Sequence, residues 1–197
     1  MESEAEAASE AYYEKKMDEP ALDDSGPDES DIAEAAEDHG ISVYADLEFV
    51  NRQVTGLAIA GLYHLWERML KEFLVREFSN YDPPYISPGE VRSAVFVKLV
   101  KLLTGIGWDV MNANFHTDLD HLHLVANVIK HGDGESCNKL MRKAPWMFHE
   151  FLHPLLHNGR KAEHLELTKE DFLRFTVAVR EFFQQFPERL NYEPRQS

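Results

Sequence analysis

The sequence is poor in cysteine, in basic residues and in long apolar runs. Cys137 is the only cysteine among 197 residues, which excludes a disulfide framework and a multi-cysteine zinc site and favours a reducing compartment. Twenty Lys and Arg face 35 Asp and Glu, a formal net charge of −15, so net charge does not favour nucleic-acid binding. No apolar run approaches the roughly 18 residues of a membrane span, and the first residues do not resemble a signal peptide. We expect a soluble cytoplasmic protein without membrane contact.

The acidic charge is concentrated at the N-terminus. Residues 1–40 contain 15 acidic residues and two basic ones, Lys15 and Lys16, a net charge of −13, which leaves −2 for residues 41–197. The segment is rich in Ala, Ser, Glu and Asp and has few large apolar residues, so we expect 1–40 to be a disordered acidic tail. Such a tail is either a solubilising extension or a regulatory arm that covers a basic site on the folded domain 41–197.

The folded domain shows helical periodicity almost throughout. A long helix is predicted from Tyr44 to about Phe78, with a core-facing stripe at spacings of mostly three and four. The stripe consists of Leu47, Val50, Val54, Leu57, Ala58, Leu62, Leu65, Leu70, Phe73 and Leu74.

Further helices are predicted from the capping signal Ser87-Pro88-Gly89-Glu90 to Gly105 or Gly107, from Thr117 or Asp118 to Gly132, and from Thr168 to Pro187. Residues 136–157 indicate short helical pieces broken by two prolines. Nothing alternates with period two. The expected fold class is all-α, an up-and-down helical bundle.

The third of these helices has two contrasting faces. Its predicted core face contains Leu119, Leu122, Val125, Ala126 and Ile129, and its opposite face contains Asp120, His123, Asn127 and His131, with Lys130 at the edge. Leu124 and Val128 flank the polar face, which favours a partner or dimer interface. Alternatively, Lys130 and His131 only complement the helix dipole, and Gly132 only caps the helix.

The run Leu124-Val125-Ala126-Asn127-Val128-Ile129-Lys130-His131-Gly132 resembles the signature helix of the HEPN superfamily. In that family an Arg, usually followed by a polar residue, precedes a His by five or six positions. The preceding long helix, with Tyr63-His64-Leu65-Trp66-Glu67, is also similar to uncharacterised bacterial relatives. The resemblance implies a helical bundle whose motif helices pair across a homodimer. It also implies a role in toxin–antitoxin or anti-phage defence systems.

In catalytic members the resemblance implies RNA cleavage without a metal or other cofactor: the His moves a proton and the Arg stabilises charge on the phosphate. Asn127 and His131 match the motif, but Ala126 stands where the Arg is expected. Lys130 or Arg142 could supply the cation instead. Two hypotheses follow. The chain is a dimeric or partner-binding module, with an antitoxin or defence component as partner, or it is an RNase toxin using His131 with Asn127 and Lys130.

Basic residues follow the motif closely. Lys139, Arg142 and Lys143 could form a positive patch that contacts an RNA phosphate backbone, or simply a solvated basic face. We expect Cys137 to be a small structural residue, because no base or motif surrounds it.

Two histidine groups suggest a third, less favoured hypothesis, a metal-binding protein. His149, His153 and His157 are four residues apart, although Pro154 interrupts their helix. A second group combines His116, His121 and His123 with Asp118 and Asp120. The packing interpretation is favoured for both, so no metal site is assigned.

Overall fold

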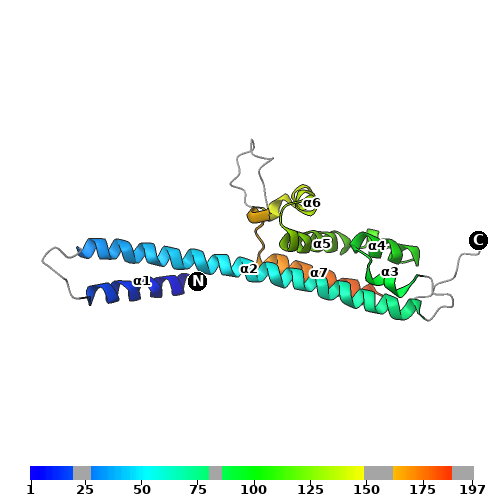
Figure 1. Ribbon diagram of the computed structural model, residues 1–197, viewed down its shortest axis with the longest axis horizontal. Coiled ribbons are helices and arrows are strands. Elements are labelled where there is room, and N and C mark those ends of the chain that lie inside the picture. The colour runs from blue at the N-terminus through cyan, green and yellow to red at the C-terminus, as the bar shows by residue number, and fades with distance from the viewer. Residues whose placement is uncertain (20–27, 80–85, 149–161, 188–197) are drawn as a thin grey trace, which may run out of the picture. The chain divides into compact units, whose positions relative to one another are not determined.

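The computed structural model describes residues 1–19, 28–79, 86–148 and 162–187, and these residues are overwhelmingly helical. The α-helices are α1 (Glu2–Met17), α2 (Glu29–Phe78), α3 (Pro88–Arg92), α4 (Phe96–Gly105), α5 (His116–His131), α6 (Glu135–Lys143) and α7 (Lys169–Gln185) (Figure 1). Short 3-10 turns are η1 (Val110–Asn112), η2 (Pro145–Met147) and η4 (Ala162–His164). An isolated bridge joins Phe148 and Leu165. The predicted all-α class is confirmed.

Backbone contacts divide the chain into two compact units, Met1–Val54 and Thr55–Ser197, with the boundary inside α2. The division into a tail, 1–40, and a domain, 41–197, was drawn from charge and stays a prediction. Within the described ranges, every helix is too short or too polar to cross a bilayer.

In the first unit, α1 packs against the N-terminal part of α2 (Figure 1). The Tyr13 hydroxyl donates to Glu29 at 3.0 Å, and the Tyr12 ring lies 5.0 Å from that of His39. Gly40 permits a close approach, because a Cβ atom there would lie 3.1 Å from the carbonyl oxygen of Ala5. Small residues therefore allow the two helices to pair.

The expectation of a disordered acidic tail is not confirmed, because residues 2–17 and 29–40 lie in helices. Two physical factors account for the difference. Ala and Glu are among the strongest helix formers, and the contact between α1 and α2 relies on small residues such as Ala5 and Ala36, both buried. The prediction of disorder looked for large apolar side chains at a regular spacing, and a contact built from alanines does not produce that pattern.

In the second unit, aromatic rings build the core. Trp66 of α2 is 1% exposed, and its ring centroid lies 5.8 Å from that of Phe96 on α4 and 5.3 Å from that of Phe182 on α7. Phe73 meets Phe186 edge-on at 4.7 Å. Helix α7 therefore packs along the C-terminal part of α2 (Figure 1).

The predicted core-facing stripe of the long helix is only partly correct. The buried hydrophobic residues of α2 in the second unit are Ile59, Ala60, Tyr63, Trp66, Leu70, Leu74 and Phe78. By contrast Val50, Val54, Leu57 and Leu65 are between 44% and 65% exposed. Periodicity identifies an apolar face but does not show what covers it.

The other helix predictions are largely confirmed. The predicted capping signal at Ser87 forms a capping box with Glu90, Thr168 forms a second capping box with Asp171, and Gly132 ends α5 with a φ of 71°. The single helix predicted from residue 88 is wrong, since α3 ends at Arg92 and α4 starts at Phe96. At this break the Ser93 hydroxyl donates to the carbonyl of Glu90, a local bond by which serine competes with helix continuation.

Two exposed glycines give a matched stability test. A Cβ atom at Gly61, inside α2, or at Gly107, with a φ of 91°, meets nothing within 4 Å. We expect Gly61→Ala to raise the free energy of unfolding by about 1 kcal/mol, because alanine has the higher helix propensity. Gly107→Ala should lower it by about 1–2 kcal/mol, because an L-residue is strained at that φ. Urea unfolding followed by circular dichroism measures both; equal effects would contradict the backbone assignment.

Candidate functional site

Helix α5, which carries the HEPN-like motif, is buried on most of its surface. The predicted core residues Leu119, Leu122, Val125 and Ala126 are at most 2% exposed. Ile129 is 38% exposed, so its assignment to the core is wrong. Leu124 and Val128 are each 3% exposed, which removes the argument that they border an external interface.

The predicted polar face is reduced to Asp120, His123 and Asn127, which we call the α5 stripe. All three are half-buried rather than exposed. The amide nitrogen of Asn127 lies 2.8 Å from His123 Nε2. The amide N–H donates to Nε2 in the histidine tautomer that carries its proton on Nδ1. That nitrogen is buried without a hydrogen-bond partner among the described residues.

Aromatic rings hold His123 in place. Its ring stacks on Phe96 of α4, with centroids 4.6 Å apart and planes 9° apart, and lies 5.6 Å from the ring of Tyr63 on α2. Burial lowers the pKa of His123, against the opposing attraction of Asp120 and Glu67. His123 is therefore a neutral, packed histidine near pH 7.

A polar network continues from Tyr63 along α2. Its hydroxyl donates to Glu67 at 3.2 Å, and burial raises the pKa of Tyr63. Lys71 approaches the same carboxylate at 3.2 Å. Glu67 also lines an open pocket of about 380 Å³, together with Arg68, Lys71, Glu72, Val75 and Arg92. The pocket carries charges of both signs, so it does not select one class of ion.

The predicted phosphate-binding residues lie on α6, and two of them are engaged by acids of the same chain. Lys139 pairs with Glu135 at 2.7 Å, and Lys143 pairs with Asp120 of the α5 stripe. Arg142 is exposed. Ion pairing leaves less positive charge for an RNA backbone than the sequence suggests, and phosphate binding by these residues stays a prediction.

His131 and Lys130 occupy the exposed last turn of α5, directly before Gly132. In the described ranges neither side chain makes a hydrogen bond or ion pair, whereas Asn127 bonds to His123. The three predicted catalytic residues are therefore on one helix but do not form a hydrogen-bonded constellation. Their assignment to catalysis stays a prediction.

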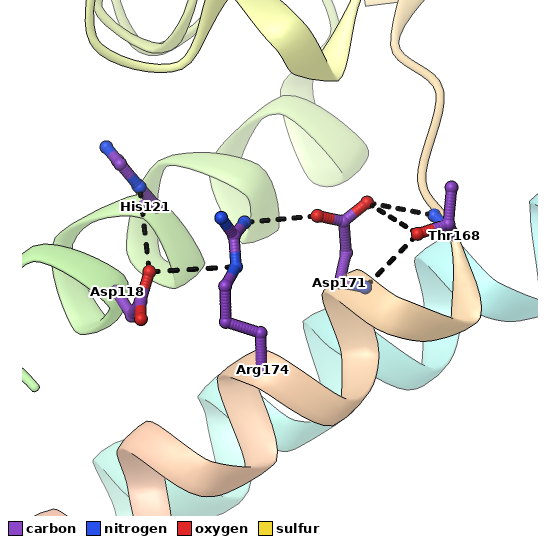
Figure 2. Close-up of polar contacts among 5 residues, drawn as sticks. All are labelled: Asp118, His121, Thr168, Asp171 and Arg174. Carbon is purple, nitrogen blue, oxygen red and sulfur yellow. Dashed lines mark hydrogen bonds and ion pairs between the residues drawn. The ribbon is translucent and has the colours of Figure 1, made fainter.

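A chain of polar contacts links the start of α5 to the start of α7 (Figure 2). The Asp118 carboxylate lies 4.0 Å from His121 Nδ1 and 3.6 Å from Arg174 Nε. Arg174 then donates to Asp171 at 3.1 Å, and Asp171 closes the capping box with Thr168. Figure 2 shows Arg174 reaching between the two carboxylates. The arrangement ties the two helices together.

The sequence alone did not predict this series of polar contacts, which joins residues some 50 positions apart. His121 was named from sequence only in the second histidine group, and no partner for it across the fold was identified. His121 is 4% exposed and meets Trp146 edge-on at 5.8 Å. Burial lowers its pKa, while Asp118 opposes that shift. A structural role fits a histidine so enclosed.

The metal hypothesis gains no support from the described residues. They contain no group of three or more His, Cys, Asp or Glu side chains placed to hold an ion, so the group around His116, His121 and His123 does not converge. His149, His153 and His157 lie outside the described residues. Cys137 is buried, and burial raises the pKa of its thiol, which suits the predicted structural role.

Comparisons with known proteins give no relative: no family model, curated protein or solved structure matches the chain. The HEPN resemblance therefore stays a prediction that depends on the motif helix and the long helix before it.

Two buried histidines predict how stability depends on pH. Their pKa values are lowered in the folded state, so the unfolded chain binds more protons once the pH falls below about 6.5. The free energy of unfolding should therefore decline below pH 6.5, by up to about 1.4 kcal/mol per pH unit for each histidine. His123→Phe should reduce that slope in urea titrations between pH 5 and 7. An unchanged slope would contradict burial of neutral His123.

Proposed function

We propose that the chain is a HEPN-like helical module that binds a protein partner and does not cleave RNA. By the resemblance, the setting is a bacterial toxin–antitoxin or anti-phage defence system. The partner is a second copy or an antitoxin or defence component.

Uncovered apolar side chains on α2 carry this proposal. Seven large ones are at least 44% exposed: Ile41, Phe49, Val50 and Val54 in the first unit, and Leu57, Leu65 and Met69 in the second. Single exposed apolar residues are ordinary, but a series along one helix is typical of a protein-binding surface.

The surroundings of the motif argue against cleavage. Ala126, at the position of the family's Arg, is 2% exposed in the core. A guanidinium at this position would lose its hydration without a partner to compensate, so burying the family's Arg here would be strongly destabilising. Asn127 is held by His123 and is not directed to a substrate by any contact.

One observation favours the alternative, an active ribonuclease. His131 and Lys130 are both exposed at the end of α5, where a phosphodiester has access to an imidazole and a cation. A second chain could then add the missing Arg. Under this alternative, RNA cleavage by the wild type is lost when His131 is replaced.

An RNA cleavage assay separates the two functions. We expect purified full-length protein to leave structured and single-stranded RNA intact, because a lone exposed histidine lacks phosphate stabilisation worth several kcal/mol. His131→Ala should match the wild type, and Lys169→Ala, on α7, serves as a surface control. RNA decay that occurs with the wild type and the control but disappears in His131→Ala would overturn the proposal.

A further inference from the structure

An open groove follows the contact between α1 and α2 in the first unit (Figure 1). It consists of two hollows of about 320 and 460 Å³, which adjoin because Ser9 lines both. Small residues form its floor, since Ala5, Ala36 and Gly40 are buried where the helices meet. The Ile41 side chain, at the wall of the first hollow, is 61% exposed. The groove therefore offers uncovered apolar surface.

Carboxylates line one wall of the groove at a regular spacing. Glu2 and Glu6 line the first hollow, and Glu10 and Glu14 line the second. Successive members are four residues apart on α1, so they follow one face of the helix at intervals of about 6 Å. Among the described residues, the ion pairs of α1 involve other side chains. Like charges at this spacing destabilise a helix, so the folding of α1 does not account for this carboxylate row.

The carboxylate row suits a long polycation better than a single ion. The groove also contains Glu37 of α2, but in the described ranges no group of three or more His, Cys, Asp or Glu side chains is placed to hold a metal ion. From Glu2 to Glu14 the row extends about 18 Å. A helix with Lys or Arg at every fourth position repeats its charges at the same interval, and the apolar stems of those side chains can lie along the floor.

We propose that this groove binds a basic amphipathic helix of a partner protein, an inference that rests on the proposed partner-binding function. Its Lys or Arg residues pair with the carboxylate row, and an apolar residue packs on Ile41. Helices in grooves are a common form of peptide recognition. Residues 1–54 contain 17 acidic and three basic residues, so they carry −14 of the chain's net charge of −15. A second copy of this groove would meet like charge here, whereas a basic helix meets opposite charge.

The test is fluorescence anisotropy of a labelled synthetic helix of about 14 residues, long enough to span the row, titrated with the full-length chain at physiological salt. This patterned peptide has lysine at every fourth position and alanine or leucine elsewhere. We expect saturable binding, and a dissociation constant about fivefold higher for Glu6→Gln/Glu10→Gln, because two partly exposed ion pairs are lost. The matched control Asp38→Asn/Asp46→Asn removes the same charge from exposed positions of α2 outside both hollows and should bind like the wild type.

Circular dichroism checks that both double variants keep their helix content. Absence of binding, or equal weakening by the two double variants, overturns the groove as the binding site. A scrambled peptide of the same composition that binds as tightly as the patterned peptide overturns the amphipathic helix as occupant, because any polycation would then suffice. These results are independent of the proposed lack of cleavage, which fails only if RNA decay depends on His131.

Discussion

Enclosure of α5 is the constraint on which the second unit depends. This helix contacts α2 and α4 through the His123 ring, α6 through Asp120 and Lys143, and α7 through Asp118 and Arg174. Apart from Thr117 in its first turn, its exposed residues lie in the last turn. A helix surrounded in this way must be apolar where it packs into the core, and the polar side chains that it half-buries are expected to find partners within the fold. In the α5 stripe Asp120 pairs with Lys143 and Asn127 bonds to His123, while His123 Nδ1 has no hydrogen-bond partner among the described residues.

Because α5 is enclosed, a resemblance of its sequence to a catalytic helix does not mean that its side chains are available for catalysis. The motif matches a catalytic helix at Asn127 and His131, yet its Arg position is packed in the core and its Asn holds a buried imidazole. The residue types that remain exposed, a lysine and a histidine, are also those that any helix favours at its C-terminal end. Packing and the helix dipole are sufficient to explain most of the residues in the motif.

Sequence predicted much of the fold and less of the site. Helix α7 with its capping box, and the end of α5 at Gly132, follow from local signals that act within a few residues, whereas α5 begins at His116, slightly before its predicted start and without a side-chain cap. The α1–α2 hairpin was missed because Ala5, Ala36 and Gly40 form a contact without large side chains. The link from Asp118 through Arg174 to Asp171 could not be predicted, because it depends on how distant helices meet. The stripe Val50–Val54–Leu57 was detected, but its periodicity could not show that this chain leaves it uncovered.

The account turns on whether the α1–α2 hairpin binds a basic partner helix, and hydrogen–deuterium exchange of its backbone amides measures that most directly. Residues 45–54 lie in a helical segment without a buried residue, and their amides should exchange rapidly in dilute protein. The account predicts that the patterned peptide slows exchange in residues 2–14 and 33–44, while exchange in residues 45–54 and in α5 stays the same. Exchange in residues 2–14 that the peptide leaves unchanged would contradict binding in the groove.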